Sequence, residues 1–196
     1  MKIINLSEGT GIYTSNVYLL TGEWNAIADI NTLIDTGRDP FIIPKIEDAS
    51  TGVGKNRVAQ VILTHSHYDH AALLPEIVKK YNPVVYACDP NVEFVNVVLK
   101  GGEMIRAADK TLEVICTPGH STDSICLYCM EDKAIFAGDS PLIINTRNNT
   151  YEKAFVNALE YISRKEINTI YFGHGKAIEK DCNEILAKSL ENIKSL

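Results

Sequence analysis

All five histidines of the chain stand where they could bind a metal ion. Three of them lie with an aspartate in the segment Thr64-His65-Ser66-His67-Tyr68-Asp69-His70. The other two, His120 and His174, each stand among turn residues. Neutral imidazole is the commonest metal ligand in proteins, and the carboxylate oxygen of aspartate suits the same borderline metals. Because no histidine is left for ordinary surface or core positions, the pattern favours metal binding over a structural role.

The candidate ligands share a position just after segments that we expect to be β-strands. The apolar run Val58–Thr64 precedes the histidine cluster. Another acid, Asp139, follows the apolar run Ala134–Ala137. His174 follows the run Thr169–Phe172. Ligands carried by loops on a rigid strand scaffold are a common way to build an active site.

The remaining sequence predicts a mixture of strands and helices. Further strands are expected at Val17–Thr21, Ala26–Ile34, Val84–Cys88, Glu103–Ala107, Thr111–Cys116 and Ile125–Met130. Helices are expected at Ala71–Tyr81, Asn91–Lys100, Glu152–Arg164 and Glu179–Lys194, with one short helix inside Pro40–Arg57. Hairpins mixed with helices predict an α/β (α+β) protein in which helices cover two sheets. No repeat or linker divides the chain, so a single domain over residues 1–196 is expected.

Composition narrows the functional classes. With 45% hydrophobic and 22% charged residues, the chain resembles ordinary globular proteins. Its formal net charge of −6 argues against a nucleic-acid partner, since such binders normally carry a basic balance. No apolar run approaches the roughly 18 residues of a membrane span, and the N-terminal residues lack the pattern of a signal peptide. We therefore expect a cytoplasmic protein that acts on a small-molecule substrate and does not associate with a membrane.

The five cysteines do not indicate a disulfide framework. Their number is odd and nothing points to secretion, so reduced thiols are expected. Cys126 and Cys129 form a C-x-x-C motif inside an expected strand. Strand neighbours three residues apart point to opposite faces, so the two sulfur atoms should diverge and serve as core side chains.

The order of the candidate ligands resembles the metallo-β-lactamase fold superfamily. The pattern His65-x-His67-x-Asp69-His70 is followed by His120, Asp139 and His174, and the resemblance runs from about residue 16 to residue 175. Asp35, in Ile34-Asp35-Thr36-Gly37, matches the upstream acid of that family. The resemblance implies a four-layer αββα sandwich with a dinuclear metal centre at one edge of the sheets.

The same resemblance implies a role for each residue. By matching position, one metal ion takes His65, His67 and His120. The other takes Asp69, His70 and His174, and the carboxylate of Asp139 bridges the pair. Asp35 is expected to lie behind these ligands, where it holds a ligand or a loop.

Mixed imidazole and carboxylate ligands suit two divalent ions, with Zn²⁺ expected and iron or manganese as alternatives. Three protein ligands per ion and a bridge leave positions for water and substrate, as in catalytic centres. Two cations that share a water lower its pKa from 15.7 towards about 7, which gives a metal-activated hydroxide at neutral pH. Asp69 is the ligand expected to act in catalysis as well, by orienting the nucleophile or passing on its proton.

The resemblance favours a hydrolase of the glyoxalase II-like (hydroxyacylglutathione hydrolase-like) branch. The phrases Thr117-Pro118-Gly119-His120 and Gly138-Asp139-Ser140 are similar to those of that branch, although its additional C-terminal helical region is missing. We therefore expect hydrolysis of an ester, thioester or lactone, without implied specificity for glutathione. The loops Pro40–Arg57 and Pro141–Tyr151 are expected to build the substrate pocket. Tyr68 is expected to act as a spacer that sets the conformation of the loop, with a contact to the substrate as the alternative.

Two alternatives stay open at this point. Mononuclear iron persulfide dioxygenases share the fold and an overlapping motif, which would make the protein an oxidoreductase. Phosphodiesterases and RNA-processing nucleases also use an H-x-H-x-D-H centre, but the acidic composition and the lack of a basic arm disfavour them. Diiron oxygen reductases generally have glutamate at the position of His67, so they fit less well.

Overall fold

The computed structural model describes residues 1–9, 11–147 and 150–194. Its strands are β1 (Lys2–Asn5), β2 (Tyr18–Thr21), β3 (Thr32–Ile34), β4 (Gln60–Ile62), β5 (Val84–Ala87), β6 (Val97–Val98), β7 (Met104–Ala107), β8 (Lys110–Cys116), β9 (Ile125–Cys129), β10 (Ala134–Gly138) and β11 (Thr169–Phe172). Its helices are α1 (Ile42–Asp48), α2 (Tyr68–Ala71), α3 (Leu74–Tyr81), α4 (Lys153–Ser163) and α5 (Cys182–Lys194). Within the described residues, no helix is both long and apolar enough to cross a membrane.

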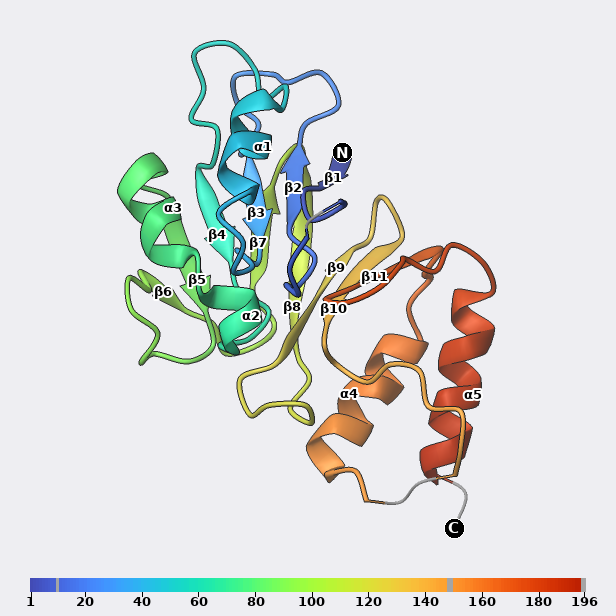
Figure 1. Ribbon diagram of the computed structural model, residues 1–196. Helices are drawn as coiled ribbons and strands as arrows, with labels where there is room; N and C mark the ends of the chain where they lie inside the picture. Colours follow the sequence, from blue (N-terminus) through green and yellow to red (C-terminus); the bar gives the residue numbers. More distant parts are fainter. Residues whose placement is uncertain (10, 148–149, 195–196) are drawn as a thin grey trace.

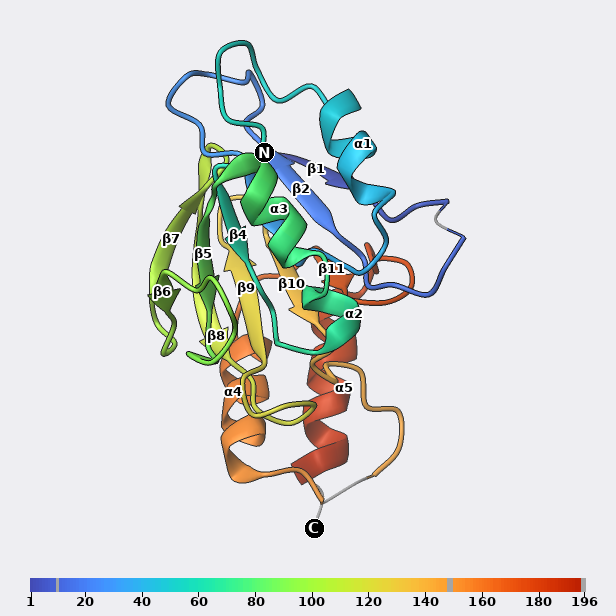
Figure 2. The ribbon, with the colours of Figure 1, turned by 60° about the vertical axis from the view of Figure 1, so that its left-hand side comes forward.

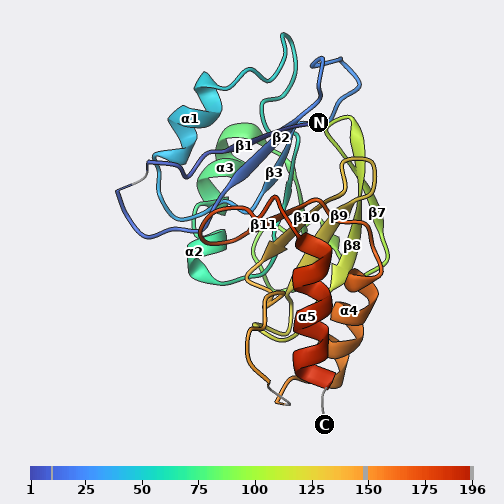
Figure 3. The same cartoon turned by 90° about the vertical axis from the view of Figure 1, so that its right-hand side faces the viewer.

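The strands form two sheets that pack face to face (Figure 1). The first sheet has the order β1-β2-β3-β4-β5-β6, with antiparallel pairs as far as β3 and parallel pairs from β3 to β6. The second has the order β11-β10-β9-β8-β7, and only β10 and β11 run parallel. Helices α1 and α3 cover the first sheet, whereas α4 and α5 lie side by side against the second (Figures 2 and 3). The expected αββα sandwich is confirmed.

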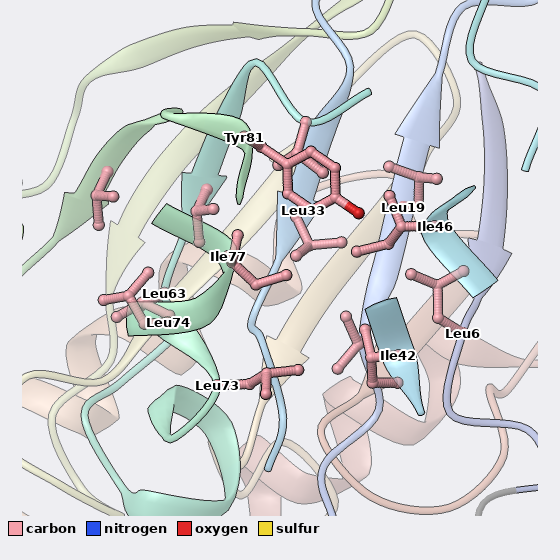
Figure 4. Close-up of a cluster of buried hydrophobic side chains, with 14 of the residues drawn as sticks. Leu6, Leu19, Leu33, Ile42, Ile46, Leu63, Leu73, Leu74, Ile77 and Tyr81 are labelled. Carbon is pink, nitrogen blue, oxygen red and sulfur yellow. The ribbon is translucent and has the colours of Figure 1, made fainter. Parts of the chain in front are cut away.

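Three buried clusters hold these four layers together. One joins α1 and α3 to the first sheet, where Ile42, Ile46 and Ile77 point toward Leu19 and Leu33 (Figure 4). A second fills the space between the sheets, and a third lies between the second sheet and α4 and α5. Because the central strands are buried on both faces, they read as continuous apolar runs rather than as alternating polar and apolar residues.

The two cysteines of the C-x-x-C motif diverge as expected. Cys126 packs in the cluster beneath α4 and α5, whereas Cys129 packs between the two sheets. Both side chains are fully buried, and all five cysteines are free thiols. Burial raises the pKa of both thiols to about 11, which keeps them protonated and poorly reactive. They are core side chains of the second sheet.

The helix predicted at Asn91–Lys100 is wrong. This segment follows the edge of the first sheet, where only Val97–Val98 forms strand β6. The side-chain oxygen of Asn96 accepts a hydrogen bond from the backbone N–H of Val85 at 2.7 Å. Phe94 has a φ of +69°, which no helix accommodates. The four valines of the segment also lower its helix propensity, because their branched Cβ atoms crowd the preceding turn.

Other predicted elements differ in extent. Of the helix predicted at Ala71–Tyr81, only Leu74–Tyr81 forms one helix, α3, because Pro75 lacks an N–H and is tolerated only in a first turn. Ala71 instead ends the preceding helix α2. The strand predicted at Ala26–Ile34 shrinks to β3, since a turn in which Asp29 N–H bonds the Ala26 carbonyl occupies its first half. Strand β1 was not predicted at all. The helices α1, α4 and α5 and the strands β7 to β11 lie where they were expected.

A half-buried ion pair fastens α4 to the second sheet, and it generates a prediction about stability. The Glu113 carboxylate on β8 lies 2.7 Å from the ammonium of Lys165 and accepts a hydrogen bond from the Tyr161 hydroxyl at 2.6 Å. Burial would raise the pKa of Glu113, but these two partners outweigh it and lower the pKa. The charged form of Glu113 therefore stabilises the fold above its unfolded pKa of about 4.3, and this contribution is lost as the pH falls through the folded pKa.

We expect Glu113→Gln to lower the free energy of unfolding by about 1–2 kcal/mol at pH 7, because it leaves the Lys165 ammonium without its anionic partner. This corresponds to a loss in Tm of roughly 2–8 °C for a chain of this size. The measurement is thermal unfolding of chelator-treated protein from pH 7 down to pH 3. The matched control is Glu166→Gln, which breaks the exposed pair with Lys133 and should cost less than about 1 kcal/mol. An equal effect of both variants, or a Glu113→Gln effect that persists at pH 3, would contradict the prediction.

Candidate metal centre

Strand direction brings the candidate residues to one edge of the sandwich. Strands β3 and β4 are parallel neighbours, so Asp35 and the histidine cluster leave the first sheet at the same end. Strands β10 and β11 are also parallel neighbours, which places Asp139 beside His174. Strand β9 runs antiparallel to β10, so the loop that carries His120 meets them at that end.

The seven residues predicted as ligands converge at this edge. One group is His65, His67 and His120, a second is Asp69, His70 and His174, and within each group one potential ligand atom per residue lies within 4.8 Å of the others. These groups have the same members as the two sets of ligands that the family resemblance implies. His65, His70 and Asp139 form a third such group, which links the other two.

The separations between potential ligand atoms suit a metal ion. His67 Nδ1 lies 3.0 Å from His65 Nε2 and 2.9 Å from His120 Nε2. His174 Nε2 lies 3.0 Å from a carboxylate oxygen of Asp69. Ligand atoms held at 2.0–2.1 Å in a tetrahedron around Zn²⁺ would stand about 3.3 Å apart. The donor atoms are therefore close to the spacing that a bound ion requires.

Asp139 stands between the two groups. Its carboxylate oxygens lie 3.4 Å from His70 Nε2, 3.5 Å from His120 Nε2 and 3.6 Å from His174 Nε2. One oxygen faces His70 and the other faces His120 and His174. A carboxylate in this position is able to contact ions on both sides.

The imidazole of His70 gives the most specific indication of a missing ligand partner. Its Nδ1 atom bonds the carboxylate of Asp35 at 2.8 Å, and the whole side chain is buried. Its Nε2 atom is buried without a hydrogen-bond partner among the described residues. A buried polar atom without a partner costs about 1–3 kcal/mol, and coordination of a cation would remove that cost. The residues present therefore fit a metal ion.

Burial and neighbouring charges shift the pKa values of three side chains in the site. Burial lowers the pKa of His65 to about 4, so its imidazole is neutral at pH 7 and free to ligate. Burial would also lower the pKa of His70, but the carboxylates of Asp35 and Asp139 outweigh it and raise the pKa to about 10. Burial would raise the pKa of Asp139, whereas its interactions with His70 and the other histidines hold it at about 2. The site thus stabilises positive charge beside Asp139.

Asp35 lies behind the candidate ligands, in contact with one of them. Besides His70, it accepts hydrogen bonds from the backbone N–H and the hydroxyl of Thr64, at 2.7 and 2.8 Å. The Thr64 hydroxyl in turn lies 3.2 Å from His65 Nδ1. Asp35 has a φ of +58°, a left-handed conformation that aspartate tolerates better than most residues. One carboxylate therefore orients the histidine cluster at both of its ends.

Two glycines keep space for the site. A Cβ at Gly173 would collide with the carboxylate of Asp139 and approach His70 Cε1 to 2.6 Å. Gly138 has a φ of +52°, and a Cβ there would lie 2.6 Å from the Thr64 hydroxyl. The backbone of β10 and β11 can approach the candidate ligands only because these positions lack side chains.

Sequence reasoning missed two residues that position the loops. The side-chain amide of Asn16 donates to the carbonyls of Phe172 and Gly175, on both sides of His174. Asp123 accepts hydrogen bonds from the Ser66 N–H at 2.8 Å and the Ser121 hydroxyl at 2.7 Å, which ties the two histidine loops together. Asp123 lies in a polar turn, a weak local signal, whereas nothing near Asn16 in the sequence indicates its partners.

A pocket of about 310 Å³ opens beside the centre. It is lined by His120, Asp139, His174, Ser140, Gly138 and four apolar residues, Pro141, Leu142, Ile143 and Phe172. The first part of the loop predicted at Pro141–Tyr151 therefore contributes to it, whereas residues 148 and 149 lie outside the described structure. The loop Pro40–Arg57, which was also predicted to line the pocket, contributes no residue to it.

Comparisons with known proteins agree with this geometry. A family model described as "Metallo-beta-lactamase superfamily" matches residues 10–174. The chain is 28% identical over 159 residues to an atrochrysone carboxyl ACP thioesterase of Aspergillus fumigatus, which covers 75% of this chain and 48% of the relative. It is 28% identical over 124 residues to a hydroxyacylglutathione hydrolase of Rhodopseudomonas palustris, which covers 60% of this chain and 49% of the relative. The chain thus spans about half the length of these relatives.

Among solved structures, the ETHE1 protein of Myxococcus xanthus is similar, with a TM-score of 0.71 and 19% sequence identity. The match covers 98% of this chain and 88% of that protein. At this level of identity the similarity concerns the fold.

We expect His120→Ala and Asp139→Ala each to lose bound metal while the fold is largely kept. Both side chains lie on loops and are partly exposed, so their truncation removes donor atoms without opening the core. Elemental analysis of the purified variants measures the metal, and circular dichroism measures the fold. Asp48→Ala, which removes an exposed carboxylate at the end of α1, is the control for loss of charge. Full metal content in either site variant would show the ligand assignment to be wrong.

We expect Asp35→Asn to weaken metal binding by about 10- to 100-fold, the usual effect of removing a hydrogen-bonding partner of a ligand. The amide keeps the shape of the side chain, but it cannot accept all three hydrogen bonds that the carboxylate receives. Competition with a chelator of known affinity measures the change. An unchanged metal affinity would mean that Asp35 serves the fold alone.

Proposed function

Because the chain belongs to the metallo-β-lactamase superfamily, we propose that it is a metal-dependent hydrolase of an ester, thioester or lactone. The observation that carries the proposal is the convergence of two groups of ligand-type side chains around Asp139, beside an open pocket. A structural metal site would be closed, whereas these groups leave room on the side of the pocket.

In the proposed centre, His65, His67 and His120 would hold one divalent ion, and Asp69, His70 and His174 would hold the other. Asp139 stands between the two groups and would be available to both ions. Zinc is the expected metal on the basis of the mixed imidazole and carboxylate donors, with iron or manganese as alternatives. Ions bound there supply Lewis acidity and a source of hydroxide at neutral pH.

The side chains of the protein have separate tasks around this centre. Asp35 fixes the ring of His70 so that Nε2 faces Asp139. Asp69 is partly exposed and near His174, so it is placed to orient water and to accept its proton. The apolar residues of the pocket, Leu142 and Phe172 among them, exclude water from the acyl part of the substrate. In the net reaction the acyl carbon gains the oxygen of water, its bond to sulfur or oxygen breaks, and the leaving group takes a proton.

The names of the relatives support hydrolysis of a thioester. One is a thioesterase acting on a carrier-bound acyl group, and another is a hydrolase of a glutathione thioester. Because the chain spans about half of each relative, the substrates of those proteins are candidates here rather than assignments.

We expect protein purified without added metal to contain about two zinc ions per chain and to hydrolyse at least one member of a panel of thioesters, lactones and phosphodiesters. Chelator treatment should abolish the activity, and added Zn²⁺ should restore it, because the proposed nucleophile is a water that the bound ions activate. The measurements are elemental analysis and product release. About one iron per chain together with persulfide-dependent oxygen uptake would contradict the hydrolase and favour a dioxygenase.

A further inference from the structure

A half-buried cation and an exposed aromatic ring lie together next to the candidate metal centre. The guanidinium carbon of Arg38 lies 5.9 Å from the centre of the Tyr68 ring, over its face. The Tyr68 side chain is 72% exposed and stands between His67 and Asp69 in the sequence. A guanidinium over the face of a ring is attracted electrostatically by the ring quadrupole. The two side chains form a surface that we call the Arg38–Tyr68 rim.

The backbone fixes this rim to the centre. Both Thr36 and Gly37 donate their N–H groups to the carbonyl of His70, at 2.8 and 3.0 Å. Arg38 donates its own N–H to the Thr14 hydroxyl at 2.9 Å. Tyr13, the residue before Thr14, stacks on the ring of His174 with ring centroids 5.0 Å apart. Arg38 is therefore anchored between one segment that contacts His70 and another that contacts His174.

Arg38 forms no ion pair with an acidic side chain among the described residues. Some cations of the described chain are paired with glutamates, for example Arg57 with Glu47 and Lys165 with Glu113, and none of the ion pairs found there includes Arg38. The Arg38 guanidinium therefore brings a positive charge to the edge of the centre in a chain whose formal net charge is −6. Its planar fork matches carboxylate and phosphate groups, so it is suited to bind an anion from solution.

The apolar pocket belongs to the opposite half of the sandwich. Leu142, at its wall, is buried in the cluster beneath α4 and α5. The helix that carries Tyr68 leads into Leu73 and Leu74, which pack in the cluster beneath α1 and α3. In Figures 1 and 3, α2 and α4 accordingly lie on different sides of the two sheets. A substrate that crosses the centre would therefore meet apolar side chains at one end and a cation at the other.

We propose that the substrate is a thioester with an apolar acyl group and an anionic thiol part, and that Arg38 binds the anion. The acyl group occupies the pocket of Leu142 and Phe172, and a carboxylate or phosphate of the thiol part contacts the guanidinium. Hydrolysis adds the oxygen of water to the acyl carbon, breaks the carbon–sulfur bond, and releases a carboxylic acid and a protonated thiol. The inference rests on the proposed function and adds the chemical class of the leaving group.

The test compares three thioesters that share a hexanoyl group. In hexanoyl-glutathione the thiol part carries carboxylates, in hexanoyl-coenzyme A it carries phosphates, and in hexanoyl-N-acetylcysteamine it is neutral. We expect Arg38→Gln to lower kcat/KM for at least one anionic thioester by about tenfold or more, the loss that follows from removing a charge-assisted hydrogen bond. The neutral thioester should change less than twofold. The anionic thioester that responds identifies the anion as carboxylate or phosphate.

Matched variants separate binding from a structural effect. Lys188→Gln removes one positive charge from the exposed face of α5 and should leave all three substrates unchanged. Tyr68→Phe should retain the difference in kcat/KM between anionic and neutral thioesters. Tyr68→Ala should reduce that difference, because the ring supports the guanidinium. Raising the salt to 0.5 M should shrink the difference between wild type and Arg38→Gln, since exposed charges are screened. An equal loss on neutral and anionic thioesters, or no loss on any, overturns the proposal.

A binding measurement distinguishes this inference from the proposed function. The non-hydrolysable thioethers S-hexylglutathione and S-hexyl-coenzyme A are titrated into wild type and Arg38→Gln by calorimetry. Affinity that falls about tenfold in Arg38→Gln for either thioether supports the anion site even if no thioester is hydrolysed. Equal affinities overturn it even if the hydrolase activity is found.

Discussion

The buried carboxylate of Asp35 is the interaction on which the arrangement of the centre depends. It receives hydrogen bonds from the backbone N–H and hydroxyl of Thr64 and from the ring of His70. Each of these donors is itself buried, so removing the acceptor would leave polar groups without partners. The segment that follows β4 is therefore held at Thr64, just after the strand, and at His70, inside α2. This is why a loop can present several metal-ligand side chains with fixed directions.

The rest of the centre follows from strand polarity. Two parallel pairs, one in each sheet, end at the same edge, and the loop before β9 closes the gap between them. The sheets are joined there by a hydrogen bond from Ile125 N–H to the Thr64 carbonyl at 2.9 Å. Tyr18 of the first sheet also donates its hydroxyl to the Phe172 carbonyl of the second at 2.7 Å. Both sheets thus contribute residues to the candidate site. The site therefore forms only when the two sheets pack in this arrangement.

Much of this arrangement could be predicted from sequence, and the failures have physical causes. Strands β4, β8, β10 and β11 lie in apolar runs bounded by turns, and the seven candidate ligands stand just after those runs, so local patterns were sufficient to place them. The helix predicted around Asn96 was wrong because the extended conformation of this segment depends on hydrogen bonds to β5. A local sequence pattern does not indicate such bonds. Asn16 and the pairing of Arg38 with Tyr68 were missed for the same reason, since their partners are far away in the sequence. Glu113 and Lys165 likewise meet only after α4 has packed.

The concentration of four candidate ligands in residues 65–70 has a consequence for how metal affects stability. A ligand stabilises a protein only to the extent that it prefers the folded chain over the unfolded one. The unfolded chain retains His65, His67, Asp69 and His70 as a flexible hexapeptide with metal affinity of its own, whereas His120, Asp139 and His174 join them only after folding. Under the proposed assignment, free zinc would therefore stabilise the fold by less than its affinity for the completed centre implies. Its preference for the native state would come from the three candidate ligands that the second sheet contributes.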